Sequence, residues 1–115
     1  MEASQSGRGP LAGVRVIELS STVAGPFCGR LLADFGAEVI KIEPAEGDAL
    51  RLMGERKDGI SLYAASILRN KKLIALDMRR SEAQALVRDL VRQADIFVEN
   101  FRPGTMEKWG LGYDA

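Results

Sequence analysis

The stretch from Val14 to Glu43 constrains the fold more than any other part of the chain. Its first segment, residues 14–19, is too continuously apolar for a strand with one face in water, and so predicts a strand buried on both faces, as in a parallel sheet covered by helices. A turn at 20–25 follows, and Pro26 suits the first position of a helix because its missing N–H has no helical partner there. Residues 38–43 form a second apolar run. The stretch therefore predicts a strand–helix–strand unit with a right-handed crossover.

The helix of this unit is expected to run from Pro26 to Phe35 and to bury one apolar stripe. Its large apolar side chains are one and four positions apart, which places them along one face, and Gly36 supplies the left-handed residue that ends the helix. The stripe consists of Phe27, Leu31, Leu32 and Phe35, which we interpret as core residues rather than a platform for a ligand. Cys28 is interpreted as a small core residue, because no histidine is present to activate its thiol.

The remainder of the chain extends the same unit. Apolar residues three and four positions apart predict a helix at Ser81–Gln93, and Ser81 with Gln84 has the spacing of a capping box at its start. Residues 44–60 lack periodicity and form an excursion longer than the usual connection, which is often functional. The predicted elements are strands at 73–77 and 96–99 and helices at Ser81–Gln93, at Ser61–Arg69 and after Thr105, which is expected to cap the last of them. The chain is therefore expected to form one α/β unit.

Composition excludes several classes of function. The 115 residues include sixteen basic and sixteen acidic side chains, so the chain has no electrostatic footprint for nucleic acid or for an anionic membrane. No apolar run approaches the roughly 20 residues that span a bilayer. A single cysteine excludes an internal disulfide, and the absence of histidine excludes a Ser-His-Asp triad, a Cys-His pair and a His-ligated zinc within this chain. These features are compatible with a cytoplasmic protein. Residues 1–9 are polar and are expected to form a disordered leader.

The strand pattern also predicts where a ligand binds. If the four strands have the doubly wound order 3-2-1-4, the switch point lies between the first and the fourth, and ligands bind outside the carboxyl ends of the strands there. The loops Ser20–Pro26 and Asn100–Gly104 leave those two strands. Gly25 permits close approach of a ligand to the backbone, and the helix N-terminus favours an anion. A dinucleotide is disfavoured, because SSTVAGP lacks the G-x-G-x-x-G spacing even though Glu43 lies where a ribose-binding acid sits.

Five separated blocks of the sequence resemble a known family. They are PLAGVRVIELSSTVAGPF, LLADFGAEVIKIEP, GDALR, LRNKKLIALDM and ADIFVENFRPGTMEKWGLGY. In this order and at this spacing they resemble the N-terminal segment of the family III CoA-transferases, from Pro10 to the last residue. The resemblance implies a Rossmann-like large domain at residues 10–115, an acyl-CoA and a carboxylic acid as substrates, no tightly bound cofactor and an interlocked homodimer.

The resemblance also assigns contacts to coenzyme A (CoA), and they fall on the loops that the topology indicates. Lys108 matches a phosphate contact that is usually arginine, and lysine lacks the bidentate fork of arginine. Val23 stands where formyl-CoA transferase has glutamine, which argues against a formyl-CoA and oxalate specificity. The basic residues Arg69, Lys71 and Lys72 fit a solvated turn as well as a phosphate contact. The implied CoA contacts are Thr22, Val23, Ala24, Leu76, Arg79, Asn100, Phe101 and Lys108.

The family's catalytic step depends on an aspartate that no residue of this chain matches. In the family this aspartate forms an aspartyl-CoA thioester with the substrate's CoA, which is nucleophilic catalysis in two steps. The resemblance therefore implies a CoA-binding segment that is truncated before the catalytic aspartate and is inactive alone. Two alternatives stay open: an α-methylacyl-CoA racemase of the same family, and a non-catalytic CoA-binding module or split subunit. The long segment Pro44–Leu68, with GDALR and SLY, favours a transferase over a racemase.

Overall fold

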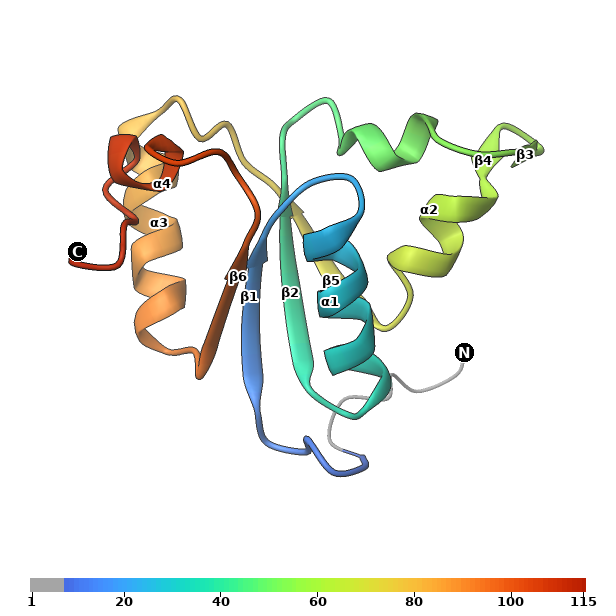
Figure 1. The fold of residues 1–115 in the computed structure, drawn as a ribbon, viewed down its shortest axis with the longest axis horizontal. Coiled ribbons are helices and arrows are strands. Elements are labelled where there is room, and N and C mark those ends of the chain that lie inside the picture. The colour runs from blue at the N-terminus through green and yellow to red at the C-terminus, as the bar shows by residue number, and fades with distance from the viewer. Residues whose placement is uncertain (1–7) are drawn as a thin grey trace.

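A parallel sheet of four strands organises the chain in the computed structural model, which describes residues 8–115 (Figure 1). The strands are β1 (Arg15–Leu19), β2 (Glu38–Glu43), β5 (Lys71–Ala75) and β6 (Ile96–Glu99), and their order in the sheet is β5-β2-β1-β6. All three pairings are parallel. The α/β class and the predicted order 3-2-1-4 are therefore confirmed. The expected leader, residues 1–9, lies outside the described residues except for its last two positions.

Helices cover both faces of this sheet. Helix α1 (Ala24–Asp34) lies on one face, and α3 (Ser81–Arg92) with the short α4 (Thr105–Lys108) lies on the other (Figure 1). Side chains alternate along β1, so that Val16 joins the core beneath α1 while Ile17 and Leu19 join the core beneath α3. A sheet with both faces covered explains why β1 has so many consecutive apolar residues.

The excursion between β2 and β5 carries structure of its own. It contains the 3₁₀ turn η1 (Ala49–Leu52), a small hairpin of β3 (Arg56–Lys57) and β4 (Ile60–Ser61), and helix α2 (Leu62–Ile67). A separate small core of Leu50, Ala64 and Ile67 holds these pieces together. The hairpin was not predicted, and α2 is shorter than the expected helix at 61–69. At its start the Ser61 Oγ accepts a hydrogen bond from the Ala64 N–H at 3.0 Å, which is a side-chain N-cap.

The start and the buried face of α1 differ from the prediction. The helix begins at Ala24, and Pro26 is its third residue, a position where a proline still removes no helical hydrogen bond. The buried residues are Gly25, Pro26, Gly29 and Ala33, whereas the predicted core residues Phe27, Leu31 and Phe35 and the predicted core Cys28 are exposed. Leu32 packs against the core as expected.

A close approach to the sheet explains this choice of face. A Cβ atom on Gly29 would lie 2.0 Å from Oε1 of Glu18, a buried side chain of β1, so only glycine fits between the helix and that carboxylate. The large apolar side chains other than Leu32 therefore lie on the outer face of α1. There Phe27 stacks beneath the Arg30 guanidinium, whose Cζ lies 4.9 Å from the ring centroid.

The predicted N-caps of two helices and the predicted start of one strand are wrong, and the predicted end of α1 is confirmed. Helix α3 is capped at Arg80 without a side-chain hydrogen bond, so Ser81 and Gln84 form no capping box; the Gln84 amide instead donates to the Met78 carbonyl at 2.9 Å. The cap of α4 is Gly104 rather than Thr105. Strand β5 begins two residues earlier than expected and includes Lys71. Gly36 ends α1 with φ +105°, as predicted.

Replacement of Gly29 by alanine should test the close approach of α1 to the sheet. Alanine is the better helix former by about 1 kcal/mol, yet its methyl group would collide with a carboxylate that two lysines hold in place. We expect Gly29→Ala to lower the free energy of unfolding by about 1–3 kcal/mol, as overpacking does. The measurement is denaturant unfolding, with Cys28→Ala on the exposed face as the control. A Gly29→Ala protein as stable as the wild type would show that the helix can move outward freely.

Candidate binding site at the carboxyl ends of the strands

A pocket of about 310 Å³ lies at the carboxyl ends of β1, β2 and β5, beside the loop that follows β6. This is the switch point of the sheet, where the sequence predicts a ligand. Its apolar lining comes from the strand ends and from the segments before α3 and after β6, and its polar lining from Glu43, Glu46, Asp77 and Arg79. The apolar lining residues are Leu19, Ile42, Leu76, Met78, Phe101 and Trp109.

The structure brings together three of the eight predicted CoA contacts in this pocket. Leu76, Arg79 and Phe101 line it. Thr22, Val23 and Ala24 lie on the neighbouring turn that leaves β1, and Val23 and Ala24 are exposed there. Asn100 and Lys108 do not line the pocket, although each precedes a residue that does. The predicted set is therefore distributed over the pocket, its adjoining turn and its rim.

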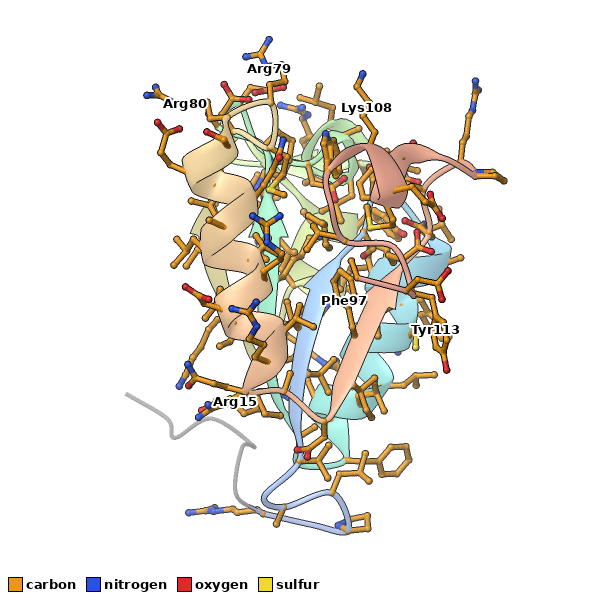
Figure 2. All side chains as sticks on the ribbon, turned by 90° about the vertical axis from the view of Figure 1, so that its left-hand side faces the viewer. Arg15, Arg79, Arg80, Phe97, Lys108 and Tyr113 are labelled. Carbon is orange, nitrogen blue, oxygen red and sulfur yellow. The ribbon has the colours of Figure 1, made fainter. Side chains whose placement is uncertain are left out.

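Positive charge gathers at this end of the molecule. Figure 2 shows Arg79, Arg80 and Lys108 at the same end, far from Arg15. The Arg79 guanidinium is bound to Asp77, with Nε 2.9 Å from Oδ1 and Nη2 3.1 Å from Oδ2, and this contact holds the pKa of the Asp77 carboxyl below its usual value. The Arg79 side chain is exposed at the pocket rim and Asp77 is half-buried, and an ion pair open to water on one side contributes little, so Arg79 is free to turn toward a phosphate. Lys108 forms no ion pair within the described residues.

An aromatic pair closes one side of the pocket. The rings of Phe101 and Trp109 meet edge to face, with centroids 5.5 Å apart and planes at 76°. The Phe101 N–H donates to Glu99 Oε2 at 2.9 Å, which fixes the chain as it leaves β6. Sequence reasoning did not assign Trp109 to the site. The signal it overlooked was the position of Trp109 directly after α4, on the same side of the sheet as the loop after β6.

The turn after β1 is fastened to the end of β6. The Asn100 Oδ1 accepts from the Ser21 N–H at 2.9 Å, and the Asn100 Nδ2 donates to the Ser21 carbonyl at 2.8 Å. Gly25 belongs to this contact, because a Cβ there would lie 2.3 Å from the Ser20 Cβ and 3.2 Å from the Asn100 side chain. The structural role of Gly25 is thus close packing within the protein, whereas the sequence suggested close approach of a ligand.

Thr22 occupies a strained position in the same turn. Its φ is +63°, in the left-handed region, which costs a residue with a Cβ about 1–2 kcal/mol. Its N–H donates to Asp48 Oδ1 at 3.2 Å, and its carbonyl accepts from the Tyr63 hydroxyl at 2.9 Å. A strained backbone of this kind persists when its surroundings over-determine it, and it is frequent at functional sites.

Four charged side chains form a buried cluster between α1 and the sheet. Glu18 accepts hydrogen bonds from Lys41 Nζ at 2.9 Å, from Lys71 Nζ at 2.6 Å and from Ser20 Oγ at 2.7 Å. Lys41 Nζ also lies 2.9 Å from Asp48 Oδ2, an oxygen that accepts no hydrogen bond from the described residues. The side chains of Glu18, Lys41, Lys71 and Asp48 are entirely buried. Two positive and two negative charges therefore balance inside the fold.

Sequence reasoning missed this cluster, although a signal was present. Glu18 and Lys41 are opposite charges in the middle of two apolar strands, and they are direct partners in the parallel register. Lys71 was read as a member of a surface cluster, but its ammonium donates to Glu18 and to the Pro26 carbonyl at 2.7 Å. Burial lowers the pKa of the Lys71 ammonium, even though Glu18 favours its charged form.

Glu43 lines the pocket, but Arg51 already occupies its carboxylate. Its carboxylate is almost fully buried and accepts hydrogen bonds from the Arg51 guanidinium at 3.1–3.3 Å. The disfavoured dinucleotide interpretation therefore loses its one supporting residue. Among the described residues no group of three or more His, Cys, Asp and Glu side chains is arranged to hold a metal ion. In residues 8–115 no helix has the length and apolarity that a membrane crossing requires.

A parallel α/β sheet with a pocket at its switch point defines a class of small-molecule-binding folds, and comparisons with known proteins give the family. The profile of CoA-transferase family III matches residues 11–115, and the chain belongs to this family. It is 54% identical over 114 residues to the succinyl-CoA–D-citramalate CoA-transferase of Chloroflexus aurantiacus, covering 97% of this chain and 28% of that protein. It is 46% identical to the succinate–glutarate CoA-transferase of Agrobacterium fabrum, covering 92% of this chain and 28% of that protein.

Solved structures agree with this assignment. A CAIB/BAIF family protein from Brucella suis superposes with a TM-score of 0.84 at 41% identity, covering 92% of this chain and 29% of that one. The Rv3272 protein from Mycobacterium tuberculosis gives the same TM-score at 42% identity and the same coverage. The chain thus spans less than a third of the length of the relatives it matches.

Replacement of Lys41 should destabilise the protein, because Lys41 pairs with both buried carboxylates. Lys41→Met leaves Asp48 without its cation and Glu18 with one ammonium instead of two. Loss of one partner from a buried ion pair costs about 3–5 kcal/mol, and we expect a loss of that size in the free energy of unfolding. Lys72→Met is the matched control, because Lys72 pairs with Glu38 at the surface and should contribute about 1 kcal/mol or less. Urea unfolding of both variants gives the comparison, and equal losses would contradict a special role for Lys41.

The stability that Asp48 provides should depend on pH. Burial disfavours the charge on Asp48, but the Leu50 N–H, the Lys41 ammonium and the Thr22 N–H outweigh it and lower the pKa of the carboxyl below its ordinary 3.8. A carboxyl with a lowered pKa stabilises the fold above its unfolded pKa, and this contribution is lost as the pH falls through the folded pKa. The difference in unfolding free energy between wild type and Asp48→Asn should therefore shrink below about pH 4. A difference that stays constant down to acid unfolding would show that the Asp48 charge is not responsible.

Proposed function

We propose that the intact protein is a CoA-transferase and that residues 10–115 bind the CoA part of its acyl-CoA substrate. The observation that carries this proposal is the pocket at the switch point. Three residues assigned to CoA from the sequence line it, although they come from two distant segments, 76–79 and 101. Apolar walls with a few polar groups at the rim suit the adenine and pantetheine of CoA, and Arg79 and Lys108 at the same end suit its phosphates.

The remaining predicted contacts have roles in the same proposal. The turn of Thr22, Val23 and Ala24 receives the thioester end of CoA, where its exposed side chains face the acyl group. Asn100 supports that turn from β6. CoA enters and leaves as a substrate, so no tightly bound cofactor is required. We propose that the protein acts in the cytoplasm as a homodimer.

The transfer chemistry is assigned to residues outside this chain. We propose that an aspartate carboxylate attacks the acyl-CoA carbonyl and expels the CoA thiolate, which leaves a mixed anhydride. The thiolate then attacks the aspartyl carbonyl of that anhydride, so that the donor acid leaves as a carboxylate and an aspartyl-CoA thioester forms. The acceptor carboxylate repeats the two steps in reverse, giving its own CoA thioester and restoring the aspartate. Residues 1–115 alone should accordingly bind CoA without exchanging it. The activities for which these relatives are named are transfers of CoA between carboxylic acids, several of them dicarboxylic, which favours a transferase over a racemase.

Succinyl-CoA is the first donor to test. Intact protein is mixed with succinyl-CoA and a second dicarboxylic acid, such as citramalate or glutarate, and the products are followed by mass spectrometry. The expected result is the CoA thioester of the second acid together with free succinate. Inversion at the α-carbon of a 2-methylacyl-CoA without any exchange would instead identify a racemase.

Replacement of Lys108 should test the placement of the CoA phosphates. We expect Lys108→Ala to weaken CoA binding roughly tenfold, the equivalent of one charge-assisted contact. The loss should be smaller for dephospho-CoA if Lys108 meets the ribose phosphate. Calorimetric titration of the intact protein gives both affinities, and Lys57→Ala on the exposed hairpin strand β3 is the matched control. Equal affinity of wild type and Lys108→Ala would remove Lys108 from the site.

A further inference from the structure

We propose that Asp48 and Tyr63 are positioning residues, which hold Thr22 in the conformation that the CoA-binding turn needs. The proposal rests on the proposed function, because that function assigns the turn to CoA. Neither residue lines the pocket, and the sequence assigned a contact with CoA to neither, although Asp48 lies in the GDALR block and Tyr63 in SLY. Both belong to the segment between β2 and β5, so the proposal also gives that excursion a function.

The turn does not hold its own shape. Threonine at φ +63° is unfavourable, and within the turn the only bond from its side chain runs from Thr22 Oγ1 to the adjacent Ser21 carbonyl at 2.8 Å. Because this hydrogen bond joins adjacent residues, it does not fix the turn relative to the rest of the protein. The left-handed conformation must therefore be imposed from outside.

Asp48 and Tyr63, both distant in the sequence, impose this conformation by binding the N–H and the C=O of Thr22. Asp48, 26 positions along the chain, accepts from the Thr22 N–H, and Tyr63, 41 positions along, donates to the Thr22 carbonyl. With both the N–H and the C=O of Thr22 engaged, rotation of either flanking peptide would break a hydrogen bond. The backbone of this residue is thereby fixed at both ends.

Asp48 is itself held rigidly. It is 2% exposed, and its Oδ1 accepts from the Leu50 N–H at 3.0 Å and from the Ser21 hydroxyl at 3.2 Å as well as from Thr22. Lys41 neutralises its second oxygen and donates to the Ser20 carbonyl at 3.0 Å. The carboxylate therefore joins the first turn of η1, the buried charge cluster and the turn after β1.

Tyr63 is anchored by the small core of the excursion. It packs against Leu50, Ala64 and Ile67, and it lies in the first turn of α2, whose start is fixed by the Ser61 cap. Its hydroxyl reaches the Thr22 carbonyl from that base. The excursion thus acts as a brace: its core supports Tyr63, and its η1 turn supports Asp48.

The test uses pairs of variants that remove the same chemical group at different places. Tyr63→Phe and Asp48→Ala remove the two contacts to Thr22. Tyr113→Phe and Asp114→Ala are their controls, at exposed positions in the last turn of the chain. In the intact ligand-free protein, amide hydrogen exchange of residues 21–24 should accelerate at least about fivefold in the first pair and stay unchanged in the controls. CoA affinity measured by calorimetry should fall about fivefold in Tyr63→Phe and further in Asp48→Ala.

A double-variant cycle separates positioning from general destabilisation. Glycine adopts φ +63° without strain. In a Thr22→Gly background the left-handed conformation therefore depends less on the hydrogen bond from the Tyr63 hydroxyl. Tyr63→Phe should then change CoA affinity less in that background than in the wild type, whereas a merely structural role would give equal changes. Wild-type affinity and unchanged exchange in Tyr63→Phe would overturn the proposal, as would equal changes in the two backgrounds. A wild-type protein that binds no CoA would overturn the proposed function, and the exchange rates alone would then decide whether the brace exists.

Discussion

The buried carboxylate of Glu18 is the constraint on which the rest of the structure depends. A charge with no access to water must be paired, and here two lysines from neighbouring strands and a serine hydroxyl pair it. The cluster lies directly beneath α1, where Oε1 of Glu18 leaves room only for glycine at position 29. The helix can approach the sheet only with small residues on its inner face. The register of three strands, the approach of α1 and the composition of that helix are thus consequences of a single buried charge.

The same constraint explains the unusual outer surface of α1. Because small residues are required inside, the large apolar residues of the helix face outward, and Val23, Phe27, Leu31 and Phe35 are between 39% and 54% exposed. They recur every four residues and form a continuous ridge. A pattern analysis that assigns the bulkiest stripe to the core selects the wrong face. The usual rule fails here because buried ion pairs occupy part of the space between helix and sheet, and the apolar core beside them takes small residues of the helix such as Ala33.

The parts of the fold set by apolar pattern could be predicted, and the parts set by polar contacts could not. The four strands, their order and the long helices follow from uninterrupted or periodic apolar residues, which report burial directly. The position of the pocket followed from the topology, and Leu76, Arg79 and Phe101, which the resemblance assigns to CoA, line it. The caps of α3 and α4 form no side-chain hydrogen bond, and Ser81 and Thr105 were plausible but unused acceptors. The contacts of Asp48 with Ser21 and Thr22 join residues 26 or 27 positions apart, which no local spacing reveals.

Two kinds of interaction shape the two halves of the candidate site, and this division suits an exchange reaction. The pocket has apolar walls, which bind by area and tolerate small shifts of a ligand. The turn at Ser20–Ala24 is fixed by directional hydrogen bonds from Asn100, Asp48 and Tyr63, which tolerate little displacement. A transferred group must be held to within a fraction of an ångström, whereas its carrier needs affinity more than accuracy. Under the proposed function, the strained residue Thr22 lies on the turn that receives the thioester, and the buried charges and the excursion keep that turn rigid.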